Sequence, residues 1–106
     1  MRRSAEEIGT LVRQDLERHG LSENSADAGP HRIDLGRRLV PPRAEIVIDS
    51  FNDGVQIKVW VVLETKPQGY SIVYDDADGF GLVTPGPKGP VLIGFYGSFV
   101  DALKAM

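Results

Sequence analysis

The sequence contains no cysteine, which excludes disulfide bonds, a thiolate nucleophile and sulfur-ligated zinc or iron–sulfur sites. It contains only two histidines, His19 and His31, and their spacing matches no metal-binding motif. It also lacks the run of about 18 apolar residues that a membrane-spanning helix needs. The first residues lack the apolar segment of a signal peptide. We therefore expect a cytoplasmic protein with no membrane segment and no bound metal.

The composition is that of an ordinary globular domain. The 106 residues, 42% of them hydrophobic and 25% charged, predict a single domain over residues 1–106. Residues 1–43 contain eight arginines and seven acids, whereas residues 44–106 contain four lysines and eight acids. The net charge of −3 argues against general nucleic-acid binding. The acidic second half would attract a basic protein partner.

Local patterns predict a helix over residues 5–18. Ser4 and Glu7 form an S-x-x-E capping box, in which each side chain can bind a free backbone N–H. Apolar residues then recur at three- and four-residue spacing, which is typical of one buried helix face. Gly20 stands where a left-handed residue would end the helix.

Residues 19–43 predict an irregular connection. Within it, residues 31–35 alternate between polar and apolar side chains, as in a short strand. Pro41 and Pro42 interrupt the chain, and they argue against a helix because proline restricts the residue before it to extended conformations.

From residue 44 the apolar period changes to two, which predicts a sheet over residues 44–96. Turn residues divide the sheet into five strands, at residues 45–49, 55–65, 70–74, 80–84 and 91–96. The short loops imply an antiparallel meander, and Ser98 can cap a last helix over residues 98–105. The expected fold class is α+β: an N-terminal helix, a five-stranded antiparallel meander with residues 31–35 as a candidate sixth strand, and a short C-terminal helix.

Alternation along the strands assigns the side chains to two faces. We expect the core face, beneath the first helix, to hold Ile46, Ile48, Val55, Ile57, Val59, Val61, Leu63, Tyr70, Ile72, Tyr74, Phe80, Leu82, Val91, Ile93 and Phe95. The opposite face also carries apolar or aromatic residues: Trp60, Val62, Val73, Val83, Leu92 and Tyr96. Three explanations stay open: the last helix or the connection covers this face, a partner docks on it, or two copies pair through it.

A candidate partner surface follows from that opposite face and from the acidic turn beside it. Tryptophan and tyrosine are enriched among the residues that dominate binding at protein interfaces, and contiguous exposed apolar patches often mark such interfaces. The candidate residues are Trp60, Val62, Val73, Tyr96, Asp75, Asp76 and Asp78.

The motifs that could carry chemistry do not meet its requirements. Residues 75–79 do not fit a calcium loop, because its first and twelfth positions would be Tyr74 and Pro85. Residues 84–90 contain glycines and a lysine, but their three prolines lack the amide hydrogens that a phosphate site needs. No serine lies in a G-x-S-x-G elbow. We therefore predict no catalytic residue, no cofactor and no metal, and hence a protein that is not an enzyme.

Four segments taken together resemble small bacterial immunity-type proteins: WVVLE at residues 60–64, GYSIVYD at 69–75, FGL at 80–82 and YGSFVDAL at 96–103. Such proteins often end a meander with a Y-G-S-F step into a short helix. The resemblance covers about residues 60–103 and carries over no binding residue. It implies a non-enzymatic protein that neutralises or binds a partner, often through an acidic surface.

The leading hypothesis is thus a non-enzymatic protein-binding domain, immunity-like or accessory, whose partner is another protein or a second copy of the chain. An alternative is a small-ligand-binding or enzymatic domain with a pocket between helix and sheet, lined by Trp60, Tyr70, Tyr74 and Tyr96. A second alternative is an RNA-associated protein that uses an arginine run, Arg32, Arg37, Arg38 and Arg43.

Overall fold

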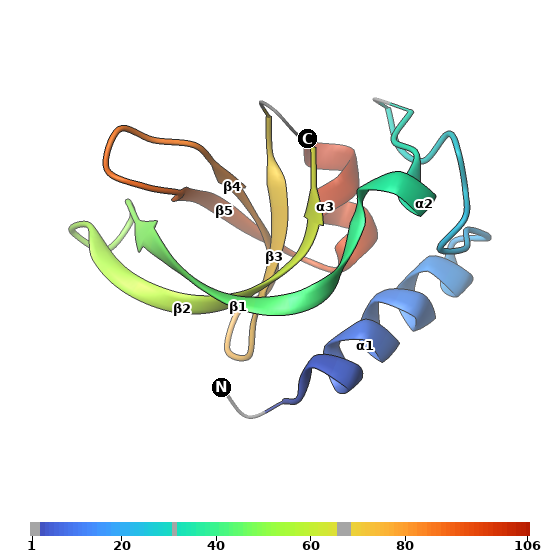
Figure 1. Ribbon diagram of the computed structural model, residues 1–106, viewed down its shortest axis with the longest axis horizontal. Coiled ribbons are helices and arrows are strands. Elements are labelled where there is room, and N and C mark those ends of the chain that lie inside the picture. Colours follow the sequence, from blue (N-terminus) through green and yellow to red (C-terminus); the bar gives the residue numbers. More distant parts are fainter. Residues whose placement is uncertain (1–2, 31, 66–68) are drawn as a thin grey trace.

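The computed structural model describes residues 3–30, 32–65 and 69–106, which form a five-stranded barrel with helices packed against it (Figure 1). It confirms the predicted α+β class and the antiparallel meander between an N-terminal and a C-terminal helix. In chain order the elements are α1 (Ala5–Arg18), α2 (Leu35–Arg38), β1 (Leu39–Asp49), β2 (Val55–Glu64), β3 (Ser71–Asp75), β4 (Gly79–Thr84), β5 (Val91–Gly97) and α3 (Phe99–Ala105).

Helix α1 begins and ends where the sequence predicts. Ser4 Oγ accepts a hydrogen bond from the Glu7 N–H at 3.2 Å, and Glu7 Oε1 accepts one from the Ser4 N–H at 3.2 Å. His19 is the C-cap, and Gly20 follows in the left-handed region with a φ of 72°. This conformation suits glycine because it has no Cβ.

The candidate sixth strand at residues 31–35 does not form in the described part of the chain. The described part of this segment makes a single β-bridge, between Ala28 and Ile33, and Leu35 already begins α2. His31 lies outside the described residues. Five alternating residues resemble a strand in sequence, but a strand is stable only when a neighbouring strand pairs along its length.

Strand β1 begins at Leu39, so the irregular connection ends earlier than predicted and the prolines belong to the sheet. Leu39 pairs with Leu63, and Arg43 pairs with Val61. Between these two pairs the chain advances four residues on β1 but only two on β2. The two extra residues make a bulge that contains Pro41 and Pro42. A bulge leaves residues unpaired, so the missing N–H groups of proline interrupt no ladder there.

The meander closes into a barrel through a contact that no local pattern predicts. Strands β1 and β5 run parallel and pair at Ile48 with Val91 and at Asp49 with Leu92. The Ile48 N–H also donates to the Pro90 carbonyl at 2.9 Å. Closure joins the first strand to the last and gives the sheet an enclosed inner face.

The described residues form two apolar cores, one inside the barrel and one between the barrel and its helices. The inner core contains Val47, Val59, Val61, Val73, Val83 and Leu92. The helix-side core contains residues of α1 and α3 together with Val62, Leu63, Ile72, Tyr74, Phe80 and Leu82 from the strands. Both faces of the sheet are therefore buried over much of its area.

The predicted assignment of side chains to faces is wrong for several strands. Val61 pairs with Val73, so these residues share the inner face, whereas Trp60 and Tyr74 share the helix side. In β1, Ile46 is 55% exposed and Val47 is buried, the reverse of the prediction. Register decides which residues share a face, and a slip of one residue reverses the assignment.

Candidate functional site

The structure does not bring the predicted partner surface together. Val62 and Val73 are 1% and 0% exposed, and they lie in the helix-side core and the inner core respectively. Trp60 is partly buried against the helix-side core, while Tyr96 is exposed near the end of β5. Trp60, Val62, Val73 and Tyr96 therefore form no continuous docking face.

Of the three acidic candidates, Asp75 is the last residue of β3, and Asp76 and Asp78 lie in the turn to β4. Burial raises the pKa of Asp75 above its ordinary value, and repulsion from Asp78 and Asp76 acts in the same direction, while backbone N–H groups of Ala77 and Asp78 partly offset it. Asp78 is exposed, and Gly79 makes the turn with a φ of 83°. Among the described residues, no group of three or more potential ligands is arranged to hold a metal ion.

Arg43, the last residue of the predicted arginine run, is paired with two carboxylates. Arg43 donates to both carboxylate oxygens of Glu64, at 2.8 and 2.9 Å, and to Glu45 at 3.3 Å. These contacts, foremost the hydrogen bond to Glu64, raise the pKa of Arg43. Arg32 and Arg37 are exposed in the segment before β1. The RNA-binding alternative stays a prediction.

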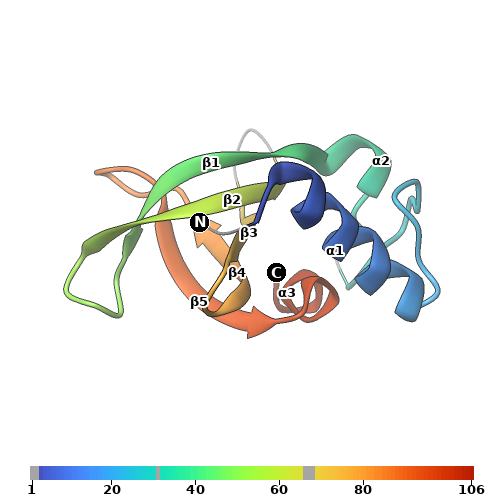
Figure 2. The same cartoon turned by 90° about the horizontal axis from the view of Figure 1, so that it is seen from below.

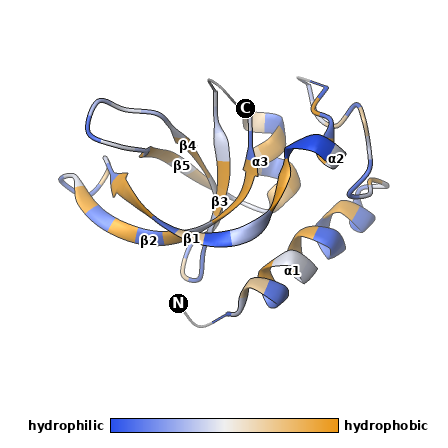
Figure 3. Ribbon diagram, in the orientation of Figure 1, coloured by the Kyte–Doolittle hydropathy of each residue, from blue (hydrophilic) through white to orange (hydrophobic). Residues whose placement is uncertain are grey.

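Exposed apolar side chains concentrate on the hairpin formed by β1 and β2. Phe51, at its turn, is 72% exposed, Ile46 is 55% exposed and Val55 is 47% exposed. Figure 2 shows this hairpin extending away from α1 and α3, and Figure 3 shows hydrophobic residues along its free part. Sequence reasoning missed this surface because it placed Ile46 and Val55 in the core.

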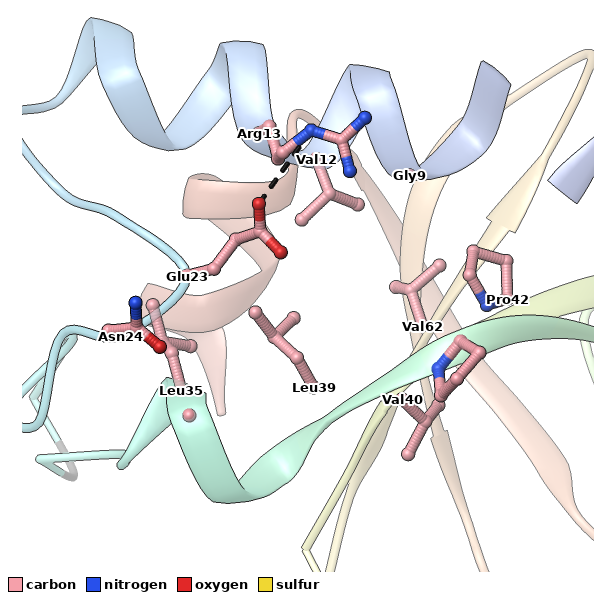
Figure 4. Close-up of a pocket in the computed structure, with 12 residues that line it drawn as sticks. Gly9, Val12, Arg13, Glu23, Asn24, Leu35, Leu39, Val40, Pro42 and Val62 are labelled. Carbon is pink, nitrogen blue, oxygen red and sulfur yellow. Dashed lines mark ion pairs between the residues drawn. The ribbon is translucent and has the colours of Figure 1, made fainter. Parts of the chain in front are cut away.

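A pocket of about 330 Å³ lies between α1 and the bulged start of β1 (Figure 4). Its walls are mostly apolar and come from four elements: Val12, Leu35, Leu39, Val40, Pro42 and Val62. Arg13 of α1 and Glu23 of the following loop stand at its rim as an ion pair, with Arg13 Nε 3.7 Å from Glu23 Oε1. The pocket thus combines apolar walls with a charged rim.

This pocket lies between helix and sheet, as the ligand-binding alternative expects, but the aromatic residues predicted to line it do not do so. Tyr74 is buried and packs on Phe80 with ring centroids 4.8 Å apart. Tyr70 and Tyr96 are 37% and 39% exposed elsewhere on the surface. Two sequence signals could have located the pocket: a glycine inside the first helix and a proline pair at the start of a strand.

Comparison with protein-family models, with curated proteins and with solved structures finds no match to this chain. The resemblance to immunity-type proteins therefore stays a prediction. Every helix within the described ranges is too short or too polar to cross a membrane.

Proposed function

We propose that this domain is a non-enzymatic, immunity-like or accessory protein that binds a basic protein partner through the β1–β2 hairpin. The observation that carries the proposal is the exposure of Phe51, Ile46 and Val55 at the free part of that one hairpin. The register places Ile46 and Val55 on opposite faces, and Phe51 lies at the turn that joins the strands, so a partner would have to enclose the hairpin. Single exposed apolar residues are normal on a protein surface. Several on one projecting element are typical of an interaction site.

Backbone pairing and a turn hydrogen bond hold the hairpin that carries these side chains. From Arg43 to Asp49, β1 pairs with β2 without interruption. At the turn, the Phe51 N–H donates to Asp49 Oδ1 at 3.0 Å, and Gly54 adopts a φ of 73°. A surface that is ordered before binding loses less conformational entropy when it binds.

The charge of the hairpin favours a basic partner over a second copy of the chain. Residues 45–58 contain three acids, Glu45, Asp49 and Asp53, and one base, Lys58. Glu45 accepts from Arg43, so Asp49 and Asp53 are the acids that would attract a basic partner. A partner with positive groups around an apolar cleft that receives the end of the hairpin would complement both features. Two copies pairing through the same hairpin would bring like charges together, which disfavours a homodimer.

A pull-down with the full chain as bait tests this proposal. Wild type and a double variant, Phe51→Ser with Ile46→Ser, are exposed to lysate of the source cells at low and at high salt. We expect wild type to recover a basic protein that salt releases, and we expect the double variant to lose it.

The matched control is Tyr70→Ser, which removes an exposed apolar side chain of 37% exposure away from the hairpin. It should recover the same protein as wild type. Recovery of no protein, equal recovery by the double variant, or a homodimer in light scattering that depends on Phe51 would each contradict the proposal.

A further inference from the structure

The pocket between α1 and β1 exists because both of its walls depart from regular structure. On one side, the bulge at Val40, Pro41 and Pro42 bends β1 out of its pairing with β2. On the other side, α1 presents Gly9, which has no side chain. Bulges are over-represented next to binding and active sites, where they re-aim side chains.

Gly9 is not explained by the backbone or by crowding. It lies in the interior of α1, and its φ is not in the left-handed region. A Cβ there would meet nothing closer than Arg13 Nη1 at 3.6 Å, an ordinary contact. Glycine inside a helix costs about 0.5–1 kcal/mol relative to alanine. Gly9 therefore lowers the stability of α1 at a position that lines the pocket.

The guanidinium of Arg13 lies at the rim of the pocket, and not all of its N–H groups donate hydrogen bonds to described residues. Its Nη2 donates to Thr10 Oγ1 at 3.0 Å, and its Nε faces Glu23 at 3.7 Å, which is too long for a hydrogen bond. Nη1 lies over Gly9, at the wall of the pocket, and donates no hydrogen bond to a described residue. A carboxylate is the group that a guanidinium binds best, through paired N–H donors.

From these features we infer that the pocket binds a small amphipathic organic carboxylate, with its apolar part on the partly exposed Leu39 and Pro42 and its carboxylate on Arg13. Val12 and Val62 are buried and form the floor beneath that part. The volume of 330 Å³ is about twice that of a cavity known to hold one benzene molecule, which allows about a dozen non-hydrogen atoms. Glu23 competes with the ligand for Arg13. This inference is independent of the proposed protein partner.

The test is a titration of the full chain with 4-phenylbutanoate, followed by NMR of the backbone amides. We expect saturable shifts at pocket residues with a Kd of about 1 mM or tighter. The matched probe 4-phenylbutanamide has the same apolar part without the negative charge. It should bind wild type at least about tenfold more weakly, because it forms no charge-assisted hydrogen bond with Arg13.

Four variants separate the contributions of charge and shape. Arg13→Gln should weaken 4-phenylbutanoate about tenfold or more and leave the amide probe unchanged. Glu23→Gln should tighten 4-phenylbutanoate, because the competing carboxylate is gone. Gly9→Leu should abolish binding of both probes by filling the pocket. Arg18→Gln is the matched control: it removes the same charge from an exposed position of the same helix and should bind like wild type.

Absence of saturable binding up to roughly 10 mM would overturn the inference, since even weak binding of a twelve-atom acid falls within that range. Equal affinity of Arg13→Gln and wild type would overturn it as well. So would amide shifts at residues away from the pocket, for example around the turn after β3.

Discussion

Asp15 connects α1 to α3 through a buried hydrogen bond. It lies on α1 and is 5% exposed, and its Oδ2 accepts from the backbone N–H of Val100, in the first turn of α3, at 2.8 Å. Arg18 is 3.9 Å from the other oxygen but its side chain is 72% exposed, so it contributes little. The carboxylate therefore satisfies an otherwise free N–H at the start of α3.

Replacing Asp15 with alanine should lower the free energy of unfolding by about 2–3 kcal/mol. Hydrogen bonds to a charged group contribute about 1.5–3 kcal/mol, and the variant also leaves the Val100 N–H buried without a partner. For a chain of this size, each kcal/mol lowers Tm by about 4–8 °C. Urea denaturation followed by circular dichroism measures the loss directly.

Two further variants make this result specific to the hydrogen bond. Asp15→Asn keeps an acceptor oxygen but loses the charge, so its stability should lie between those of wild type and Asp15→Ala. Glu17→Ala removes an exposed acid from the same helix and should change stability by less than about 0.5 kcal/mol. If Asp15→Ala were as stable as Glu17→Ala, the role assigned to the buried carboxylate would be refuted.

Three other changes have defined outcomes. Asp75→Asn should stabilise the protein near pH 7, because burial raises the folded-state pKa of Asp75 and its ionisation therefore lowers the free energy of unfolding at that pH. In urea denaturation, the variant's extra stability should vanish as pH falls below the ordinary pKa of aspartate, where Asp75 is protonated in both the folded and the unfolded state. Ser98→Ala removes the side chain that caps α3, accepting from the Asp101 N–H at 3.1 Å, and should cost about 0.5–2 kcal/mol by the same assay. Gly9→Ala should raise Tm, because alanine stabilises a helix interior by about 0.5–1 kcal/mol, and an unchanged or lower Tm would show that Gly9 has a role in packing.

The elements of this fold could be predicted from the sequence because their signals are local. The capping box at Ser4, the helix stop at Gly20 and the cap at Ser98 each involve hydrogen bonds between near neighbours. The five strands follow from period-two patterning and turn residues. Each of these features depends only on residues that are a few positions apart in the sequence.

The barrel and its two cores depend on contacts between distant residues. The parallel pairing of Ile48 with Val91 joins segments more than forty positions apart. Residues 59–63 of β2 are apolar at every position, so alternation cannot tell which side chains face inward. Bulges then shift the register on both sides of this strand.

The candidate sites could be predicted only in part. A pocket does lie between helix and sheet, but the predicted aromatic residues do not line it, because Tyr74 belongs to the buried core with Phe80. Whether the pocket binds a ligand stays a prediction. The exposed hairpin side chains could not be predicted, because alternation in β1 assigns Ile46 to the core, whereas in the structure Val47 is buried and Ile46 is exposed. In sequence alone a proline pair marks an interruption, whereas in the structure Pro41 and Pro42 lie in the bulge that shapes the pocket.

The most direct test of the central claim is hydrogen–deuterium exchange of the chain, alone and with the protein that it captures. We predict slower exchange on binding for residues 45–58, the β1–β2 hairpin, and little change at the turn between β3 and β4. Protection of that acidic turn or of α3, with the hairpin unchanged, would contradict the account.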